Sequence, residues 1–128
     1  MMKRSLISVL SLLMLVLCIP ALAESTDWNY DANYAILRGY DGAGGDVVVP
    51  AEIDGFTVDV IGINVFKGDT ITSLTLPETV LELRSNAVAS CEKLTSVTLP
   101  QSLVVINRMN FFSCNALSEV TIPASVRY

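Results

Sequence analysis

The chain has 128 residues and a formal net charge of −5, from 13 acidic and 8 basic side chains, and it contains no His. The absence of His excludes Ser-His and Cys-His nucleophile pairs, imidazole general bases and His-containing zinc sites. Three Cys residues, one of them in an apolar leader, cannot form a four-thiolate zinc site. The composition therefore favours a non-catalytic secreted module, and we assign no catalytic, cofactor-binding or metal-binding residue.

Residues 1–23 are typical of a signal peptide. Basic residues precede an apolar run over residues 6–19, and small residues that suit signal peptidase end at Ala23. A membrane anchor is the alternative, but this run of about 14 residues is shorter than the roughly 20 that span a bilayer. Lipidation at Cys18 is a weaker alternative, because that chemistry prefers a small residue where Leu17 stands. We predict cleavage after Ala23 and a secreted, extracellular or cell-surface location.

The remaining chain, residues 24–128, is strongly acidic. Both charges of the leader are positive, so 13 acidic and 6 basic residues remain and the net charge becomes −7. Eight of the acids lie in residues 24–59, against Arg38 as the single base. Binding to phosphates needs clustered Lys and Arg, so we expect no nucleic-acid partner. We expect residues 24–46 to form an irregular acidic lead-in to the first strand.

Two segments of this lead-in look like cation sites. Residues 27–33 alternate Asp and Asn like a calcium loop, but Ala32 stands where Gly is needed and Arg38 where Glu is needed. The glycine-rich residues 42–46 resemble a calcium-binding repeat that occurs only once. We therefore interpret the first as a polar segment and the second as a glycine turn before a strand.

From residue 47 onward the chain is a repeat. Four Pro residues recur at intervals of 27, 23 and 23 residues, and each ends a strand-like triplet. An aliphatic residue stands three positions after each Pro, and columns of Ile or Leu, Phe or Val, Cys, and Leu follow with the same spacing. The four prolines are Pro50, Pro77, Pro100 and Pro123. So many columns with one period are typical of a solenoid, and the first unit carries an insertion around residues 54–56.

The period predicts a mostly β repeat solenoid of about three 23-residue coils of short parallel strands with 3-10 or helical turns. The coils are 47–73, 74–96 and 97–119, with a partial coil over 120–128. The predicted strands are 47–49, 58–60, 74–76, 80–83, 97–99, 103–106 and 120–122, and the predicted turn is 86–91. One coil cannot bury its own apolar side, so like residues should form buried columns such as Leu76, Leu99 and Ile122.

A family pattern is visible in the run from Leu94 through Pro100 and Ile106 to Cys114. This run resembles the BspA-like, or Treponema pallidum type, leucine-rich repeat of bacterial surface proteins, LxxLxLPxxLxxIgxxAFxxCxx. The likeness covers about residues 34–128, with departures such as Asn110, where the pattern has Ala before Phe, and Arg84 and Asn107, where it has Gly. The resemblance implies a bacterial surface or extracellular leucine-rich repeat protein from a family linked to adhesion and host-matrix binding.

Three further motifs belong to the repeat. Residues 76–80 resemble a sortase signal without its Gly, and the same register recurs in the next two units, so wall anchoring is not expected. Cys91 and Cys114 share a column on adjacent coils, where a strand spacing of about 4.8 Å makes a disulfide sterically conceivable. We favour buried free thiols, because free Cys behaves as a small hydrophobe. An outward column of Thr75, Thr98 and Thr121, with Ser73, Ser96 and Glu119 beside it, reflects the strand propensity of exposed Thr.

These features favour a secreted or cell-surface bacterial leucine-rich repeat module for recognition or adhesion, whose partner is an extracellular protein or glycan. The alternative is an accessory repeat region truncated from a larger secreted enzyme or surface protein. The binding face is not assigned. Because the residues after Pro123 stop partway through a fourth unit, we expect an uncapped C-terminal coil that allows end-to-end self-association.

Overall fold

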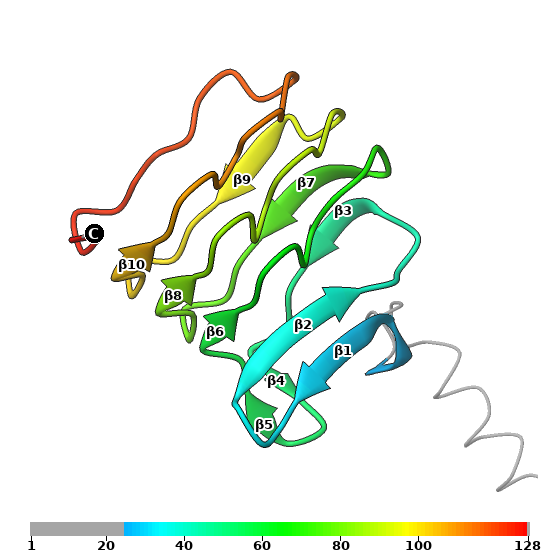
Figure 1. Ribbon diagram of the computed structural model, residues 1–128, viewed down its shortest axis with the longest axis vertical. Coiled ribbons are helices and arrows are strands. Elements are labelled where there is room, and N and C mark those ends of the chain that lie inside the picture. Colours follow the sequence, from blue (N-terminus) through cyan, green and yellow to red (C-terminus); the bar gives the residue numbers. More distant parts are fainter. Residues whose placement is uncertain (1–24, 128) are drawn as a thin grey trace, which may run out of the picture.

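The computed structural model describes residues 25–127, which wind into a β-solenoid of about three coils (Figure 1). The predicted signal peptide lies outside the described residues. The elements are the 3-10 turn η1 (Ser25–Asp27) and the strands β1 (Trp28–Asp31), β2 (Ile36–Tyr40), β3 (Gly45–Val48), β4 (Glu52–Ile53), β5 (Phe56–Thr57), β6 (Val60–Ile61), β7 (Ile71–Thr75), β8 (Glu82–Leu83), β9 (Ser96–Thr98) and β10 (Val105–Ile106). Two walls enclose the core: a three-stranded sheet β3-β7-β9 and a five-stranded sheet β1-β2-β6-β8-β10.

The first wall repeats the strand that precedes each Pro. In β7 the buried Leu74 points inward and Thr75 points outward, because side chains alternate along a strand. Parallel pairing joins Val47 to Leu74 and Leu74 to Val97, and these two steps equal the first two intervals between the prolines. The predicted strands before Pro50, Pro77 and Pro100 are confirmed. They end one residue earlier than predicted, since Pro has no N–H to donate to the ladder.

The second wall stacks the shorter strands. Parallel pairing runs from Leu37 through Ile61 and Leu83 to Ile106, which confirms strands in this part of each coil. The observed strands are only two residues long and begin later than predicted. The cause is a repeated bulge: the carbonyl of Asp59 accepts bonds from both Leu81 N and Glu82 N, and Leu81 O accepts from the equivalent pair in the next coil.

The acidic lead-in is an ordered hairpin, so the prediction of an irregular segment is wrong. β1 pairs antiparallel with β2, and β2 pairs parallel with β6, which extends the second wall beyond the repeat. Trp28, Ile36 and Leu37 are buried in this extension. In Figure 1 the hairpin covers the first coil at one end of the stack. A register shift between Asn29 and Tyr30 disturbs the ladder at β1, a feature that protects edge strands from pairing with other chains.

The insertion in the first unit forms a second hairpin, β4-β5. Its turn residues Asp54 and Gly55 have φ angles of 51° and 84°. Two consecutive left-handed residues are the geometry of a type I′ turn, for which Asp-Gly is a favoured sequence. The extra residues are therefore accommodated outside the stack, and the spacing of the coils is preserved.

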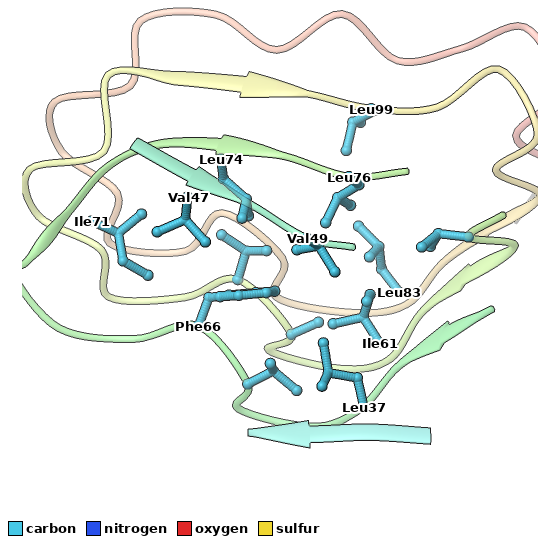
Figure 2. Packing of buried hydrophobic residues seen from close by; sticks show 14 of the residues in the cluster. Leu37, Val47, Val49, Ile61, Phe66, Ile71, Leu74, Leu76, Leu83 and Leu99 are labelled. Carbon is cyan, nitrogen blue, oxygen red and sulfur yellow. The ribbon is translucent and has the colours of Figure 1, made fainter. Parts of the chain in front are cut away.

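The core lies between the walls. Figure 2 shows Val47, Leu74 and Leu76 pointing from the first wall toward side chains of the second wall, and the Phe66 ring lying within the cluster. Phe66 is fully buried, and its ring centroid lies 6.4 Å from that of Trp28 and 6.0 Å from that of Tyr40. Trp28 and Tyr40 come from the hairpin, so this aromatic cluster joins the lead-in to the repeat.

Two details of the predicted repeat are wrong. Leu76 and Leu99 are buried, but Ile122 is 50 % exposed and residues 120–122 form no strand. No further coil covers Ile122 within the described part of the chain, which removes the partner that a buried column requires. The turn at 86–91 is not helical, because the carbonyl of Ala87 and the N–H of Ala89 bond to Phe66 of the preceding coil and keep this segment extended.

Side-chain hydroxyls connect the coils at one repeated position, two residues after the Pro. Thr79 Oγ1 donates to Val58 O at 2.6 Å and Ser102 Oγ donates to Val80 O at 2.9 Å. Ser125 Oγ donates to Leu103 O at 2.6 Å. Within the described residues these carbonyls accept no other hydrogen bond. The Thr of the sortase-like motif therefore has a structural role in stacking.

Removal of the Phe66 ring should destabilise the fold strongly. We expect Phe66→Ala to lower the free energy of unfolding by about 3–5 kcal/mol, the range for truncating a buried aromatic residue. The matched control is Phe112→Ala at a position that is 56 % exposed, where we expect a loss within about 0.5 kcal/mol. Urea unfolding followed by circular dichroism measures both. Equal losses would contradict the proposed core.

Removal of a single inter-coil hydroxyl should have a smaller but measurable effect. Ser102→Ala leaves the carbonyl of Val80 without its hydrogen bond, so we expect a loss of about 1–2 kcal/mol. Ser96→Ala removes the same group from an exposed position and should cost less than about 0.5 kcal/mol. Urea unfolding separates the two variants, and a Ser102→Ala protein as stable as the control would show that these bonds contribute nothing.

Candidate functional site

The outer side of the first wall carries a continuous group of hydroxyl side chains, which we call the hydroxyl face. It consists of the outward residues of β7, β9 and the residues just before β9: Thr72, Ser73, Thr75, Thr95, Ser96 and Thr98. Register pairing places Ser73 beside Ser96 and Thr75 beside Thr98. The face is therefore a two-dimensional array, in agreement with the predicted Thr75 and Thr98 column and the Ser73 and Ser96 beside it, whereas Thr121, the third member of the predicted column, lies outside any strand.

Asp46 is the only charged residue in β3, β7 and β9. Its Oδ1 accepts a hydrogen bond from Ser73 Oγ at 2.7 Å and a longer one from Thr72 Oγ1 at 3.4 Å. The neighbouring Val48 is 64 % exposed. The side of the hydroxyl face next to β3 thus has an acidic and an apolar border, while β7 and β9 carry no charged residue.

Three hydroxyls of this face have no hydrogen-bond partner among residues 25–127. The side chains of Thr72, Ser73 and Thr95 are engaged in hydrogen bonds within the chain. The hydroxyls of Thr75, Ser96 and Thr98 make none to any described residue, although all three lie on paired strands. A hydroxyl offers one donor and two acceptor positions, so this cluster can form several hydrogen bonds to a ligand.

In the calcium-like segment, the Asp31 carboxylate is bonded within the chain. Asp31 Oδ2 accepts a bond from Arg38 Nε at 2.7 Å, and Asp31 Oδ1 accepts from the backbone N–H of Asn33 at 3.0 Å. The described residues hold no group of three His, Cys, Asp or Glu side chains placed to share a metal ion. Asp31, the fifth residue of the calcium-like segment, is thus committed to the β1-β2 hairpin.

Cys91 and Cys114 are both buried free thiols, stacked in one column as the repeat predicts. Burial, together with the neighbouring Cys114, raises the pKa of the Cys91 thiol to about 12. Each Sγ lies near a carbonyl oxygen two residues before it, at 3.7 Å for Cys91 and 3.8 Å for Cys114. Since the thiolate is the nucleophilic form, Cys91 is unreactive at neutral pH.

The third coil ends in exposed apolar residues. Met109 is 54 % and Phe112 is 56 % exposed, and Ile122 lies beyond them on the same terminal part of the chain. β9 and β10 each pair on one side only. These observations agree with an open end of the described array, whereas self-association through it stays a prediction.

Asn110 has a structural role that the departure from the repeat pattern did not reveal. Its Oδ1 accepts from Val88 N at 3.1 Å, and its Nδ2 donates to Arg84 O at 3.0 Å. In the preceding pair of coils the equivalent acceptor is a backbone carbonyl, that of Ala87, which binds Phe66 N. The carboxamide therefore substitutes for backbone in the ladder. In the sequence, the feature that pointed to this role was the replacement of a small residue by Asn at one position of the repeat.

Comparison with known proteins agrees with this architecture. Residues 52–128 match the family described as BspA type leucine rich repeat region (6 copies). The structure is similar to a leucine-rich repeat protein of T. pallidum, with a TM-score of 0.73 and 27 % identity over 84 % of this chain. It is also similar to a leucine-rich repeat protein from Bacteroides capillosus, with a TM-score of 0.67 and 35 % identity over 77 % of this chain and 78 % of that one.

The chain spans about half the length of the T. pallidum protein, 51 %. No protein of curated function matches it. Within residues 25–127, no helix has the length and apolar character needed to cross a membrane.

The buried thiol should make stability fall at high pH. A thiol has an ordinary pKa near 8.5–9 when the chain is unfolded, whereas Cys91 in the folded protein has a pKa of about 12. The unfolded state therefore loses its proton first, so the stabilisation is complete only below about pH 8 and is lost progressively as the pH rises toward about 12. One group contributes at most about 1.4 kcal/mol per pH unit.

Cys91→Ala removes this contribution. We expect the free energy of unfolding of the unmodified protein to fall more steeply between pH 8 and pH 10.5 than that of the variant, as measured in urea at each pH. Parallel pH profiles for the two proteins would show that Cys91 ionises equally in both states.

Proposed function

Because the chain belongs to the BspA-type leucine-rich repeat family, we propose that it is a non-catalytic bacterial module that recognises an extracellular protein or glycan through its hydroxyl face. The proposal includes secretion or display at the cell surface, as the N-terminal sequence predicts. The observation that carries it is the cluster of Thr75, Ser96 and Thr98 hydroxyls, which form no hydrogen bond to any residue that the structure describes.

Hydroxyl groups on a rigid sheet suit recognition for two reasons. The strands hold the groups at fixed spacings, so little conformational entropy is lost when a ligand binds. An uncharged surface also avoids the cost of removing water from ions, and direct or water-mediated hydrogen bonds can form with peptide groups or sugar hydroxyls. The absence of charged side chains on β7 and β9 favours a neutral surface on the partner.

An accessory repeat region of a larger secreted enzyme or surface protein is the second candidate. Its support is that the similar T. pallidum protein is about twice as long as the part this chain matches, because only 51 % of it is covered. Binding that maps to the hydroxyl face of this chain would favour recognition by the module itself.

Substitution of Thr98 in the hydroxyl face should weaken recognition. The full chain is expressed in a secreting bacterial host, and mass spectrometry checks that the exported protein begins at Glu24. Binding is measured on a panel of immobilised extracellular-matrix glycoproteins and neutral oligosaccharides. Thr98→Lys places a long charged side chain among the unpartnered hydroxyls, and we expect at least about tenfold weaker binding, as for loss of an interface hot spot.

Thr57→Lys is the matched control. Thr57 is an exposed strand residue in the β4-β5 hairpin, outside the first wall, and the substitution adds the same charge. We expect its binding to stay within about twofold of the unmodified protein. Equal losses in both variants, or none in either, would contradict a role for the hydroxyl face.

A further inference from the structure

The second wall carries a column of side chains that follows each of its short strands. Pairing of Leu37 with Ile61 and of Ile61 with Leu83 brings the next residues, Arg38, Gly62 and Arg84, side by side. Backbone bonds maintain this register: Gly62 N donates to Leu37 O at 2.8 Å, and Arg84 N donates to Ile61 O at 2.9 Å. Two arginines thus flank a position that has no side chain.

The missing side chain leaves a pocket. A pocket of about 100 Å³ is lined by Ile36, Arg38, Gly62, Ile63 and Arg84. Neighbouring strands are about 4.8 Å apart, so the two arginine backbones are separated by about 9.6 Å, which leaves room for a small planar group between them. A Cβ at Gly62 would lie 2.6 Å from the carbonyl oxygen of Leu37, so this position requires Gly for backbone packing as well.

The guanidinium groups retain unused donors. Arg38 donates through Nε to Asp31, and Arg84 Nε lies 3.8 Å from Glu82 Oε1, too far for a hydrogen bond. The Nη groups of both arginines donate to no described residue. The hydrogen bond to Asp31 fixes the orientation of the Arg38 guanidinium group before a ligand binds. This reduces the conformational entropy that is lost on binding. Because these two acids offset the formal charge, recognition here depends on directed hydrogen bonds rather than on net charge.

An aromatic ring lies beside the pocket. Tyr34 contacts Arg38, with the guanidinium carbon 5.5 Å from the ring centroid, and Tyr34 is 69 % exposed. Ile63, on the pocket wall, is 58 % exposed. The exposed ring of Tyr34 provides an apolar surface for a ring-shaped ligand, and the guanidinium groups beside it can donate hydrogen bonds to an anion.

We propose that Arg38 and Arg84 form an anion clamp over Gly62 that binds the carboxylate of an acidic sugar within a glycan. Arg donors match a carboxylate bidentately. The pocket is far smaller than the roughly 300 Å³ or more of sites that enclose a whole ligand, so it holds one functional group while the sugar ring extends over Tyr34. The clamp lies on the opposite wall from the hydroxyl face and does not depend on the function proposed for that face.

The test uses trigalacturonate and its methyl ester, in which methylation removes the negative charge of each carboxylate. Chemical-shift changes in the backbone amides of the secreted, isotope-labelled protein measure binding. We expect trigalacturonate to shift the amides of Gly62, Ile63 and Arg84, and the methyl ester to bind at least about tenfold more weakly. Shifts confined to the hydroxyl face, or equal binding of the ester, would overturn the proposal.

Two pairs of variants complete the test. Arg84→Gln should weaken binding of trigalacturonate about tenfold or more, whereas Arg108→Gln removes the same charge from the third coil and should leave binding unchanged. Tyr34→Ala should weaken binding, and Tyr34→Phe should retain it. Equal losses in the two Arg variants would overturn the clamp. A hexaglutamate peptide that binds as tightly as trigalacturonate, with no effect of Tyr34→Ala, would overturn the assignment to a glycan.

Binding to the hydroxyl face provides an independent control. Thr98→Lys should leave the shifts caused by trigalacturonate unchanged, because Thr98 lies on the other wall. Failure of the recognition proposed above therefore leaves the clamp intact, and failure of the clamp leaves that recognition intact. Loss of trigalacturonate binding in Thr98→Lys would overturn the clamp as a separate site.

Discussion

Each coil of this protein has one apolar interior edge, and it can bury that edge only against the coils beside it. The rest of the structure depends on this requirement. It imposes the interval of about 23 residues between paired strands such as β7 and β9, since a longer or shorter coil would shift inward side chains outward. The insertion in the first unit is tolerated because β4-β5 is extruded as a hairpin. The hydroxyls of Thr79, Ser102 and Ser125 then satisfy carbonyls that the sheet ladders leave unpaired.

The same requirement explains which parts of the fold could be predicted from the sequence. The prolines and the columns of aliphatic residues report directly on stacking, so the two walls, the buried Leu76 and Leu99, and the Cys column follow from them. The β1-β2 hairpin did not, because its residues lie outside the repeat and its charges obscured the inward Trp28 and Leu37. Ile122 was predicted from its column alone, and a column position is buried only where the next coil is present. β8 and β10 are short because of a backbone bulge, and no residue type in the sequence indicates where this bulge lies.

The candidate sites were harder to predict because they occupy positions that stacking leaves free. Outward residues of a strand need only tolerate an extended backbone, so Thr and Ser at these positions are equally consistent with strand propensity and with binding. What distinguishes Thr75, Ser96 and Thr98 is that their hydroxyls lack partners, which only the three-dimensional arrangement shows. For Arg84 a signal did exist, since it replaces Gly in the repeat pattern. The role of Arg84 could be recognised only from the strand register, which places Arg38 two strands away, across Gly62.

The φ angles of the turn residues show that the conformational strain of the backbone differs from coil to coil. Each coil turns through two left-handed residues, occupied by Asn64 and Gly68 in the first coil and by Asn86 and Ser90 in the second. Asn and Gly adopt this conformation readily, whereas other residues lose roughly 1–2 kcal/mol there. In the third coil the equivalent residues are Met109 and Ser113, and Phe111 between them is left-handed as well.

The third coil therefore carries the most backbone strain and has a neighbour on one side only among the described residues. Its Asn110 offsets part of this cost, because a flexible carboxamide reaches Val88 N where a strained backbone carbonyl does not. The first coil has the opposite combination, with favourable turn residues and an aromatic cluster that ties it to the hairpin. Stability should thus decline from the hairpin toward the third coil. The anion clamp, on the strands around Gly62, lies in the better supported part, which suits a site that needs rigid positions, whereas β9 of the hydroxyl face lies at the open edge of the first wall.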